Sequence, residues 1–126
     1  MQGGCLCGKV RYQLKKEPMY SLICYCTQCQ TLGGGFSVGT VVVGVDDVQI
    51  TQGDDFLTVY SLPKCIRKFC KLCGTNVIAS NPKHPMIGVN VGSLDDKSIF
   101  KPQVAIWCKS LKPHHTVPEN VPKFDE

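Results

Sequence analysis

Short stretches of alternating apolar and polar residues run along the whole chain. In the clearest of them, Val10, Tyr12 and Leu14 alternate with Arg11 and Gln13, which is the period of a half-buried strand. Other stretches rich in β-branched and aromatic residues also have the composition of strands, and they span residues 36–45, 48–51, 56–61, 66–69, 75–79, 86–91 and 104–108. No segment keeps a 3.6-residue period over three turns. The pattern therefore predicts a mainly β protein of many short strands.

Glycine, proline and aspartate residues separate these stretches. The pair Gly3-Gly4 predicts a flexible entry to the chain. Residues 30–32 predict a single helical turn, which the run Gly33-Gly34-Gly35 ends. The last segment, residues 113–126, contains three prolines and few core residues. We expect this tail to wrap around the surface.

The chain has 126 residues, which suits one domain, 1–126, and is too short for two ordinary ones. A domain of this size can form a core but gains from a metal staple. The formal net charge is +4 and the Lys and Arg residues are scattered, so nucleic acid is not favoured as a partner. No apolar run is long enough to span a bilayer, and we expect no membrane association. The oligomeric state is left open.

Nine cysteines are far more than a globular chain of this length usually carries. In a secreted protein such a number suggests disulfides. Here the number is odd, and the first residues show neither the charged nor the apolar part of a secretory leader. Seven of the cysteines also have the spacing of metal ligands. We therefore predict metal-bound thiols in a reducing compartment, with the cytoplasm expected and the nucleus left open.

Four of the cysteines form two pairs, Cys5-x-Cys7 and Cys70-x-x-Cys73. A tetrahedral zinc ion with four thiolates needs sulfurs about 3.8 Å apart, which both spacings can supply. We predict a closed, structural zinc site on these four residues. The rival interpretation is a redox dithiol at Cys70 and Cys73 alone. Gly74 directly after the second pair, and the existence of the first pair, favour metal.

Cys24, Cys26 and Cys29 form a C-x-C-x-x-C motif, one ligand short of a closed tetrahedral shell. Either a distant residue (Cys65, Cys108 or a histidine) completes a second structural zinc site, or the fourth position is open and the zinc is catalytic. The spacing does not decide between these two. A zinc ion with three thiolates is a poor Lewis acid for water and is better suited to hold a substrate thiol as its thiolate. The open site thus implies addition or elimination at a carbon attached to sulfur, and the chain would carry two zinc ions.

Weaker candidates lie near the cysteines. The run that includes Gly33 and Gly34 is either a turn, the favoured interpretation, or a place where backbone N–H groups approach a bound carboxylate. Arg67 and Lys68 are either solvated strand charges or contacts of an anionic substrate. The remaining aromatic and imidazole candidates are expected in the core or lining a pocket (Phe36, Trp107) or in solvent (His84, His114, His115).

The motifs recur in a characteristic order along the chain. They are Gly3-x-Cys5-x-Cys7-Gly8-x-Val10-Arg11-Tyr12, Cys24-x-Cys26-x-x-Cys29 with Gly34 and Phe36, Tyr60-Ser61, Arg67-x-Phe69-Cys70-x-x-Cys73-Gly74-Thr75, Gly92-Ser93-Leu94-Asp95-Asp96 and Pro122-x-Phe124. This series resembles the glutathione-dependent formaldehyde-activating family, which includes centromere protein V. The resemblance covers nearly the whole chain.

The resemblance implies an Mss4-like fold of several short antiparallel sheets, stapled by a structural zinc on the four paired cysteines. It also implies a catalytic zinc on Cys24, Cys26 and Cys29, where glutathione or its hydroxymethyl adduct would bind. The implied activity is that of a carbon–sulfur lyase, either S-(hydroxymethyl)glutathione synthase or the reverse cleavage. Gly33, Gly34 and Arg67 are our candidate substrate contacts.

Two positions depart from the family pattern. Tyr25 stands where family members usually have a histidine, and Ala105 stands where a histidine is common. Their loss implies either a missing proton relay or a different thiol adduct. Two rival hypotheses are therefore kept: a non-catalytic, zinc-stabilised binding module for protein or nucleic acid, and a thiol-based sensor that uses Cys65 and Cys108.

Overall fold

The strands form two sheets in the computed structural model, which describes residues 1–126. The smaller sheet has the order β1-β2-β5, and the larger has the order β10-β3-β4-β9-β8-β7-β6. All neighbouring strands are antiparallel except β10 and β3. The strand bounds are β1 (Gln2–Gly4), β2 (Arg11–Leu14), β3 (Tyr20–Cys24), β4 (Val38–Gly44), β5 (Val48–Gln52), β6 (Leu57–Leu62), β7 (Cys65–Cys70), β8 (Asn76–Ser80), β9 (Met86–Asn90) and β10 (Val104–Ile106). The prediction of a mainly β protein is confirmed.

A single α-helix, α1 (Thr27–Gly33), follows β3 after a short connection and is longer than the turn predicted for residues 30–32. Its last residue precedes Gly34, which has a left-handed backbone (φ 64°) and so ends the helix as the glycine run predicts. Five 3₁₀ turns complete the structure: η1 (Val45–Asp47), η2 (Asp54–Phe56), η3 (Val91–Ser93), η4 (Lys97–Ile99) and η5 (Cys108–Ser110). None of the helices has both the length and the apolar character needed to cross a membrane.

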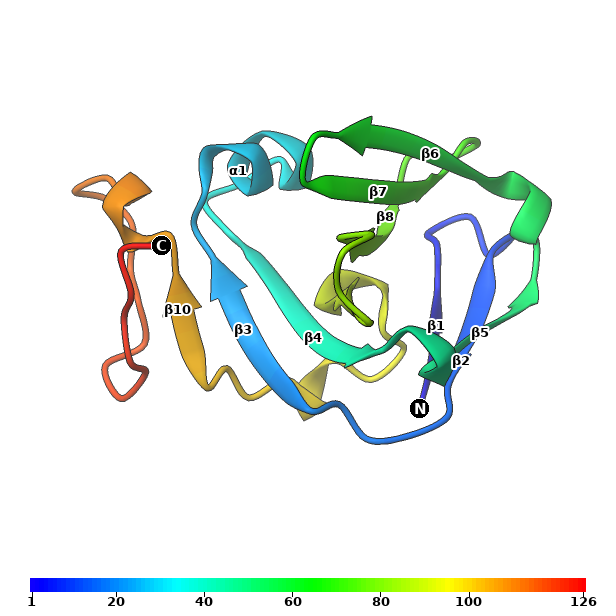
Figure 1. The fold of residues 1–126 in the computed structure, drawn as a ribbon, viewed down its shortest axis with the longest axis horizontal. Coiled ribbons are helices and arrows are strands. Elements are labelled where there is room, and N and C mark those ends of the chain that lie inside the picture. The colour runs from blue at the N-terminus through cyan, green and yellow to red at the C-terminus, as the bar shows by residue number, and fades with distance from the viewer.

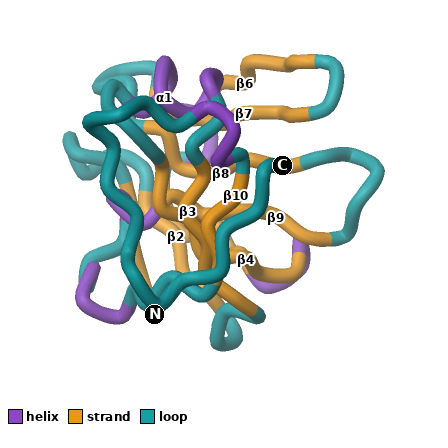
Figure 2. The backbone as a smooth tube through the Cα atoms, turned by 90° about the vertical axis from the view of Figure 1, so that its left-hand side faces the viewer, coloured by secondary structure: helices purple, strands orange, loops and turns teal.

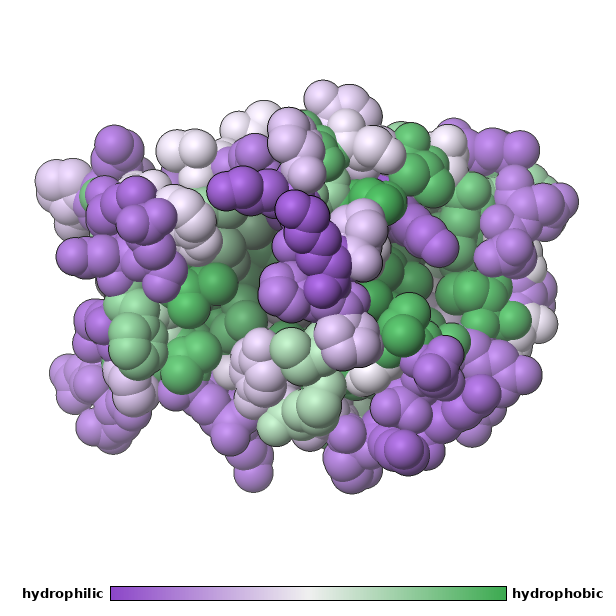
Figure 3. Space-filling view, in the orientation of Figure 1, coloured by the Kyte–Doolittle hydropathy of each residue, from purple (hydrophilic) through white to green (hydrophobic).

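The small sheet lies at one end of the molecule, and β10 lies with the C-terminal tail at the other (Figure 1). From the side, the strands gather in the centre with loops around them, and the β6–β7 hairpin extends at the top (Figure 2). The surface is polar around the rim, while apolar residues gather over β3 and β10 and near the small sheet (Figure 3). The helix α1 lies between the two ends, above β4 (Figure 1).

The main core lies between the two sheets. Tyr12 and Leu14 of β2 are buried and the intervening Gln13 is exposed, as the alternating pattern predicts. They pack against Val41 and Val43 of β4, together with Val77, Ile78, Ile87, Val89 and Leu94. The middle of β4 buries three consecutive residues. A strand that is covered on both faces has such a continuous apolar run.

A second cluster joins β3, β10 and the tail. Ile23, Tyr25, Ala105 and Val121 form it. The tail runs beside β10, because the N–H of Ala105 donates to the carbonyl of Pro122 (2.8 Å) and the N–H of Phe124 donates to the carbonyl of Ala105 (2.9 Å). The predicted surface tail is therefore attached through backbone hydrogen bonds.

Two expectations are wrong. Gly3-Gly4 is not a flexible entry but part of β1, which pairs with β2. A Cβ on Gly3 would lie 2.3 Å from the Tyr12 hydroxyl, so glycine serves here to let the strand approach the aromatic ring. Phe36 is not a core residue: its side chain is 57% exposed, because β4 begins only at Val38.

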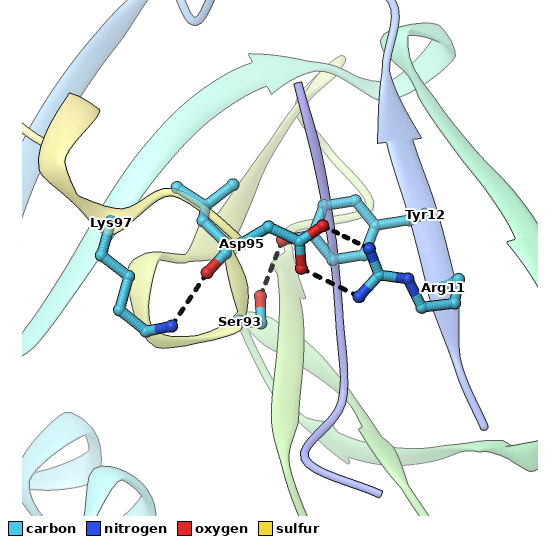
Figure 4. A network of polar contacts seen from close by, with 6 residues as sticks. Arg11, Tyr12, Ser93, Asp95 and Lys97 are labelled. Carbon is cyan, nitrogen blue, oxygen red and sulfur yellow. Dashed lines mark hydrogen bonds and ion pairs between the residues drawn. The ribbon is translucent and has the colours of Figure 1, made fainter. Parts of the chain in front are cut away.

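A polar network fastens the small sheet to the segment after β9 (Figure 4). Arg11 makes a bidentate ion pair with Asp95, with one N–H···O distance of 2.9 Å. The Tyr12 hydroxyl lies 2.8 Å from Ser93 Oγ, and Ser93 donates its own proton to the carbonyl of Asn90 (2.7 Å). Tyr12 is thus the donor to Ser93. Burial raises the pKa of Tyr12 to about 12, although the hydrogen bond to Ser93 opposes this rise.

We predict that Tyr12→Phe lowers the free energy of unfolding by about 1 kcal/mol at pH 7, since one buried hydrogen bond is lost. A raised folded-state pKa contributes stability that is complete below the unfolded value of about 10 and is lost as the pH rises to about 12. Between pH 10 and pH 12, the free energy of unfolding of wild type should therefore fall by about 2–3 kcal/mol more than that of the variant. Urea unfolding at pH 7, 10, 11 and 12 measures the difference in free energy of unfolding between wild type and Tyr12→Phe. A difference that stays constant over these pH values contradicts a raised pKa of Tyr12.

Candidate metal centres

The four paired cysteines meet at the junction of the two sheets. Cys5 and Cys7 lie in the turn between β1 and β2, Cys70 ends β7, and Cys73 lies in the turn before β8. All four sulfurs lie within 4.8 Å of one another. Cys7 Sγ is 3.5 Å from Cys5 Sγ and 3.8 Å from Cys70 Sγ. These separations fit four thiolates on one tetrahedral zinc ion, where about 3.8 Å is required.

Both turns have the same local design. Gly8 and Gly74 have left-handed backbones (φ 79° and 77°), and their N–H groups donate to the carbonyls of Cys5 (3.1 Å) and Cys70 (2.8 Å). The N–H of Val10 also donates to Cys5 Sγ (3.3 Å). Such turns aim the two sulfurs of a pair inward and surround them with donors, which stabilises thiolates.

Thr75 connects the two turns. Its Oγ1 accepts a hydrogen bond from the N–H of Leu6 (3.1 Å) and lies 3.2 Å from Cys73 Sγ. The hydrogen bond with the Thr75 hydroxyl is the largest factor that lowers the pKa of Cys73, to about 5. Thr75 was part of the motif series, but its role as a bridge between turns almost seventy residues apart became visible only in the structure.

We predict that Cys70→Ser prevents stable folding at 25 °C. Apparent binding energies of about 10–16 kcal/mol for structural zinc match or exceed the net stability of a small domain, about 5–15 kcal/mol. Cys65→Ser is the matched control, since Cys65 begins the same strand and lies outside both cysteine clusters. Circular dichroism with and without a chelator measures the effect. Equal melting of Cys70→Ser and Cys65→Ser would contradict a stabilising metal at this site.

The other three cysteines meet where β3 passes into α1. Cys24 ends β3, Cys26 is the N-cap of α1, and Cys29 lies in its first turn. The N–H of Cys29 donates to Cys26 Sγ (3.3 Å), so the helix cap itself sets the spacing of two of the sulfurs. All three sulfurs lie within 4.8 Å of one another. Cys24 and Cys29 are buried, whereas Cys26 is half-buried and gives the cluster its exposed side.

No fourth ligand joins this trio. Cys65, Cys108 and the histidines all lie outside the group of sulfurs. Cys108 Sγ instead lies 3.6 Å from the carbonyl oxygen of Ala105. The structure therefore groups three sulfurs without a fourth cysteine or histidine, and the open metal site on them stays a prediction.

Arg67 reaches the trio from β7. It is 8% exposed, and its Nη2 lies 3.5 Å from Cys29 Sγ. The hydrogen bond with Cys24 is the largest factor that lowers the pKa of Cys29, to about 5; Arg67 adds to this effect, and burial opposes it. Arg67 is therefore not a solvated strand charge, because its side chain is buried against a sulfur. Its role as a contact of an anionic substrate stays a prediction. Lys68 lies on the other face of the strand, beside Ile50 and Ile78.

Comparison with known proteins bears directly on these two clusters. The sequence model of the family described as glutathione-dependent formaldehyde-activating enzyme matches residues 1–110, a range that contains all nine cysteines. The chain belongs to this family. A crystal structure of a Rhodobacter sphaeroides protein is also similar: the identity is 25%, the alignment covers 75% of this chain and 88% of that chain, and the TM-score is 0.64. The recognition and the fold expected from it are confirmed.

In this member of the formaldehyde-activating family, a polar cleft of about 410 Å³ lies between the loops that follow the two clusters. Its lining includes Gly33 from the end of α1, Thr75 and Asn76 from the turn after the first cluster, and Asn90 and Ser93 near η3. Asn76 Nδ2 donates to the carbonyl of Leu32 (3.0 Å) and so ties the end of α1 to β8. Gly33 therefore lines the cleft, whereas Gly34 caps the helix and does not line it. Both stay predicted substrate contacts.

An aromatic cluster beside the trio was missed from the sequence. Phe36 lies 4.9 Å from His114 and 4.7 Å from His115, measured between ring centroids. The Tyr25 hydroxyl donates to the carbonyl of Thr116 (2.9 Å). Of the three histidines that we expected in solvent, His84 is exposed as expected, whereas His114 and His115 pack against Phe36, with His114 still exposed. No local pattern indicates a contact between residues about eighty positions apart.

Proposed function

We propose that this protein is a zinc-dependent carbon–sulfur lyase or synthase that acts on a thiol adduct, with S-(hydroxymethyl)glutathione or a related glutathione conjugate as substrate. One observation carries the proposal. In a chain of the glutathione-dependent formaldehyde-activating family, Cys24, Cys26 and Cys29 converge with one half-exposed sulfur and no fourth protein ligand. Catalytic zinc sites have three protein ligands and keep one position for water or substrate, whereas structural sites have four.

Zinc is the metal we propose for both clusters, two ions per chain, since soft thiolate ligands in tetrahedral arrangement favour it. At the trio, zinc would lower the pKa of a substrate thiol and hold it as thiolate. Cys24 and Cys29 would hold the ion from the buried side, and the half-buried Cys26 leaves access from outside. In the synthetic direction the substrate sulfur forms a bond to the formaldehyde carbon, and the carbonyl oxygen gains a proton while the thiol loses one. Cleavage reverses each change.

The polar cleft is our proposed binding site for the peptide part of the substrate. Glutathione offers two carboxylates, an ammonium group and two amides, all of which need polar partners. The cleft provides hydroxyl and amide side chains from Ser37, Thr75, Asn76, Asn90 and Ser93. Gly33 follows Cys29 by four residues, which corresponds to a distance of about 6 Å along a helix. A bound tripeptide could therefore extend its thiol toward the trio.

The reaction itself is the first test. With two equivalents of zinc, wild type should accelerate exchange between free glutathione and its hydroxymethyl adduct beyond the spontaneous rate, as measured by NMR exchange spectroscopy. Cys26→Ser should lose about a hundredfold or more of this acceleration, because one ligand of the open site is gone. Its circular dichroism should be unchanged, since Cys26 lies outside the first cluster. No acceleration by the folded, two-zinc wild type would refute the proposed activity on this substrate.

The cleft can be tested by filling it. Gly92 lines the cleft, and a Cβ at this position meets nothing within 4 Å. Gly92→Leu should therefore raise the Michaelis constant for glutathione about tenfold, a loss of about 1.4 kcal/mol of binding, without a change in melting temperature. Gly35→Leu is the matched control, since Gly35 is equally open and does not line the cleft. Equal Michaelis constants for glutathione in the two variants would exclude this cleft as the substrate-binding site.

The non-catalytic binding module has one observation in its favour. Leu6 and Leu72, the residues inside the two paired-cysteine turns, are 89% and 57% exposed. Exposed apolar residues on a rigid turn suit a protein partner. Such binding would survive Cys26→Ser and would be lost in a Leu6→Ser/Leu72→Ser variant, so the two candidate functions separate cleanly. For either function we propose a reducing compartment, the cytoplasm first, because both clusters need free thiols.

A further inference from the structure

Arg67 presents an electrostatic problem that the proposed reaction does not by itself explain. The guanidinium is 8% exposed, and its Nε is buried with no hydrogen-bond acceptor. The ion pairs in the structure join Arg11 to Asp95, Lys16 to Asp47 and Lys109 to Glu126, and none includes Arg67. Burying a cation without an anion is strongly unfavourable. A negative charge must therefore lie close to Arg67 in the functional protein.

The cysteine trio is the one acceptor that the structure offers. Arg67 Nη2 is 3.5 Å from Cys29 Sγ, and Cys29 is itself buried. Three thiolates with one divalent cation carry a net charge of −1, which the guanidinium balances. The two buried charges thus need each other: the loaded trio without Arg67 would be an uncompensated anion, and Arg67 without the loaded trio is an uncompensated cation.

We propose that Arg67 is the counter-ion of the metal-loaded trio, and that it is a positioning residue that sets the affinity for the metal and the preference for an anionic fourth ligand. With Arg67 present, the net charge of the trio, its zinc ion and the guanidinium is zero, and a bound substrate thiolate changes it to −1. Without Arg67, the same ligand would give a net charge of −2. A neutral water molecule as fourth ligand leaves the net charge unchanged in both cases. Arg67 therefore selects a thiolate over water. This inference rests on metal binding by the trio, which is part of the proposed function, and not on the reaction.

The sheet fixes Arg67 in this position. In β7 it pairs with Tyr60 of β6 on one side and with Ala79 of β8 on the other. The next residue, Lys68, points to the opposite face, where it lines a separate hollow with Ile78. Strand alternation thus places one of two adjacent cations at the trio and the other away from it. Lys68 is for this reason a matched control for the loss of a positive charge.

The test compares Arg67→Met, Arg67→Lys and Lys68→Met by zinc competition against a chromophoric chelator. The equivalent of zinc that Cys26→Ser removes identifies the trio. For that equivalent Arg67→Met should weaken binding about tenfold to a hundredfold, as for other groups that support metal ligands. Arg67→Lys should recover part of the loss, and Lys68→Met should bind like wild type. Normal zinc affinity in Arg67→Met, or equal losses in Arg67→Met and Lys68→Met, would overturn the proposal.

Two further readouts separate a counter-ion from a merely structural residue. With zinc only at the first cluster, Arg67→Met should melt at the same or a higher temperature than wild type, because a buried lone charge has been removed; a lower temperature would overturn the proposal. In the cobalt-loaded protein, glutathione should change the visible spectrum of wild type at lower concentrations than that of Arg67→Met. Identical titrations would overturn the claimed preference for thiolate. None of these measurements requires turnover, so an inactive wild type would refute the proposed reaction and leave this inference standing.

Discussion

The convergence of four sulfurs from two distant turns is the contact on which the rest of the structure depends. It joins the β1–β2 turn of the small sheet to the β7–β8 turn of the large one, more than sixty residues later. The core between the sheets is a cluster of nine buried residues. A cross-link that closes a long loop restrains the unfolded chain, so a metal ion held by the four sulfurs would add to the stability that this core supplies.

Strand β7 connects this cluster to the second one. Its last residue, Cys70, belongs to the first cluster, and Arg67, three residues earlier, contacts the trio. The rigid end of the strand thus fixes the position of the guanidinium. The polar cleft shares this dependence, because the three residues that follow Cys73 line it: Gly74, Thr75 and Asn76. The first cluster serves as scaffold for the charge and for the cleft.

Much of this arrangement was predictable because it is local. The C-x-C and C-x-x-C spacings, the strand alternation of residues 10–14 and the glycine end of α1 each depend on neighbours in sequence. What escaped prediction depends on tertiary contacts. The sequence around Gly3 indicates flexibility, and only the contact with Tyr12 shows why glycine is needed there. The sequence likewise allows Arg67 to be a solvated charge, and only its contact with Cys29 of α1 shows that it is not. The spacing of cysteines in the sequence did not indicate whether Cys65 or Cys108 joins the trio, because a contact between residues far apart in sequence is set by the tertiary fold.

The two departures from the family pattern lie in one place. Tyr25 and Ala105, where histidines are expected by resemblance, belong to the same buried cluster with Ile23 and Val121. A large aromatic residue and a small one thus share one packed volume, and the Tyr25 hydroxyl donates to the tail at Thr116. Two imidazoles of the tail nevertheless lie on this side of the trio: His115 is 6.3 Å from Tyr25 and 4.7 Å from His114, measured between ring centroids. Arg67 is the charged group in contact with the sulfurs. Under the proposed function, a proton would therefore be moved by the substrate, by water or by one of these two imidazoles rather than by Tyr25 or Ala105.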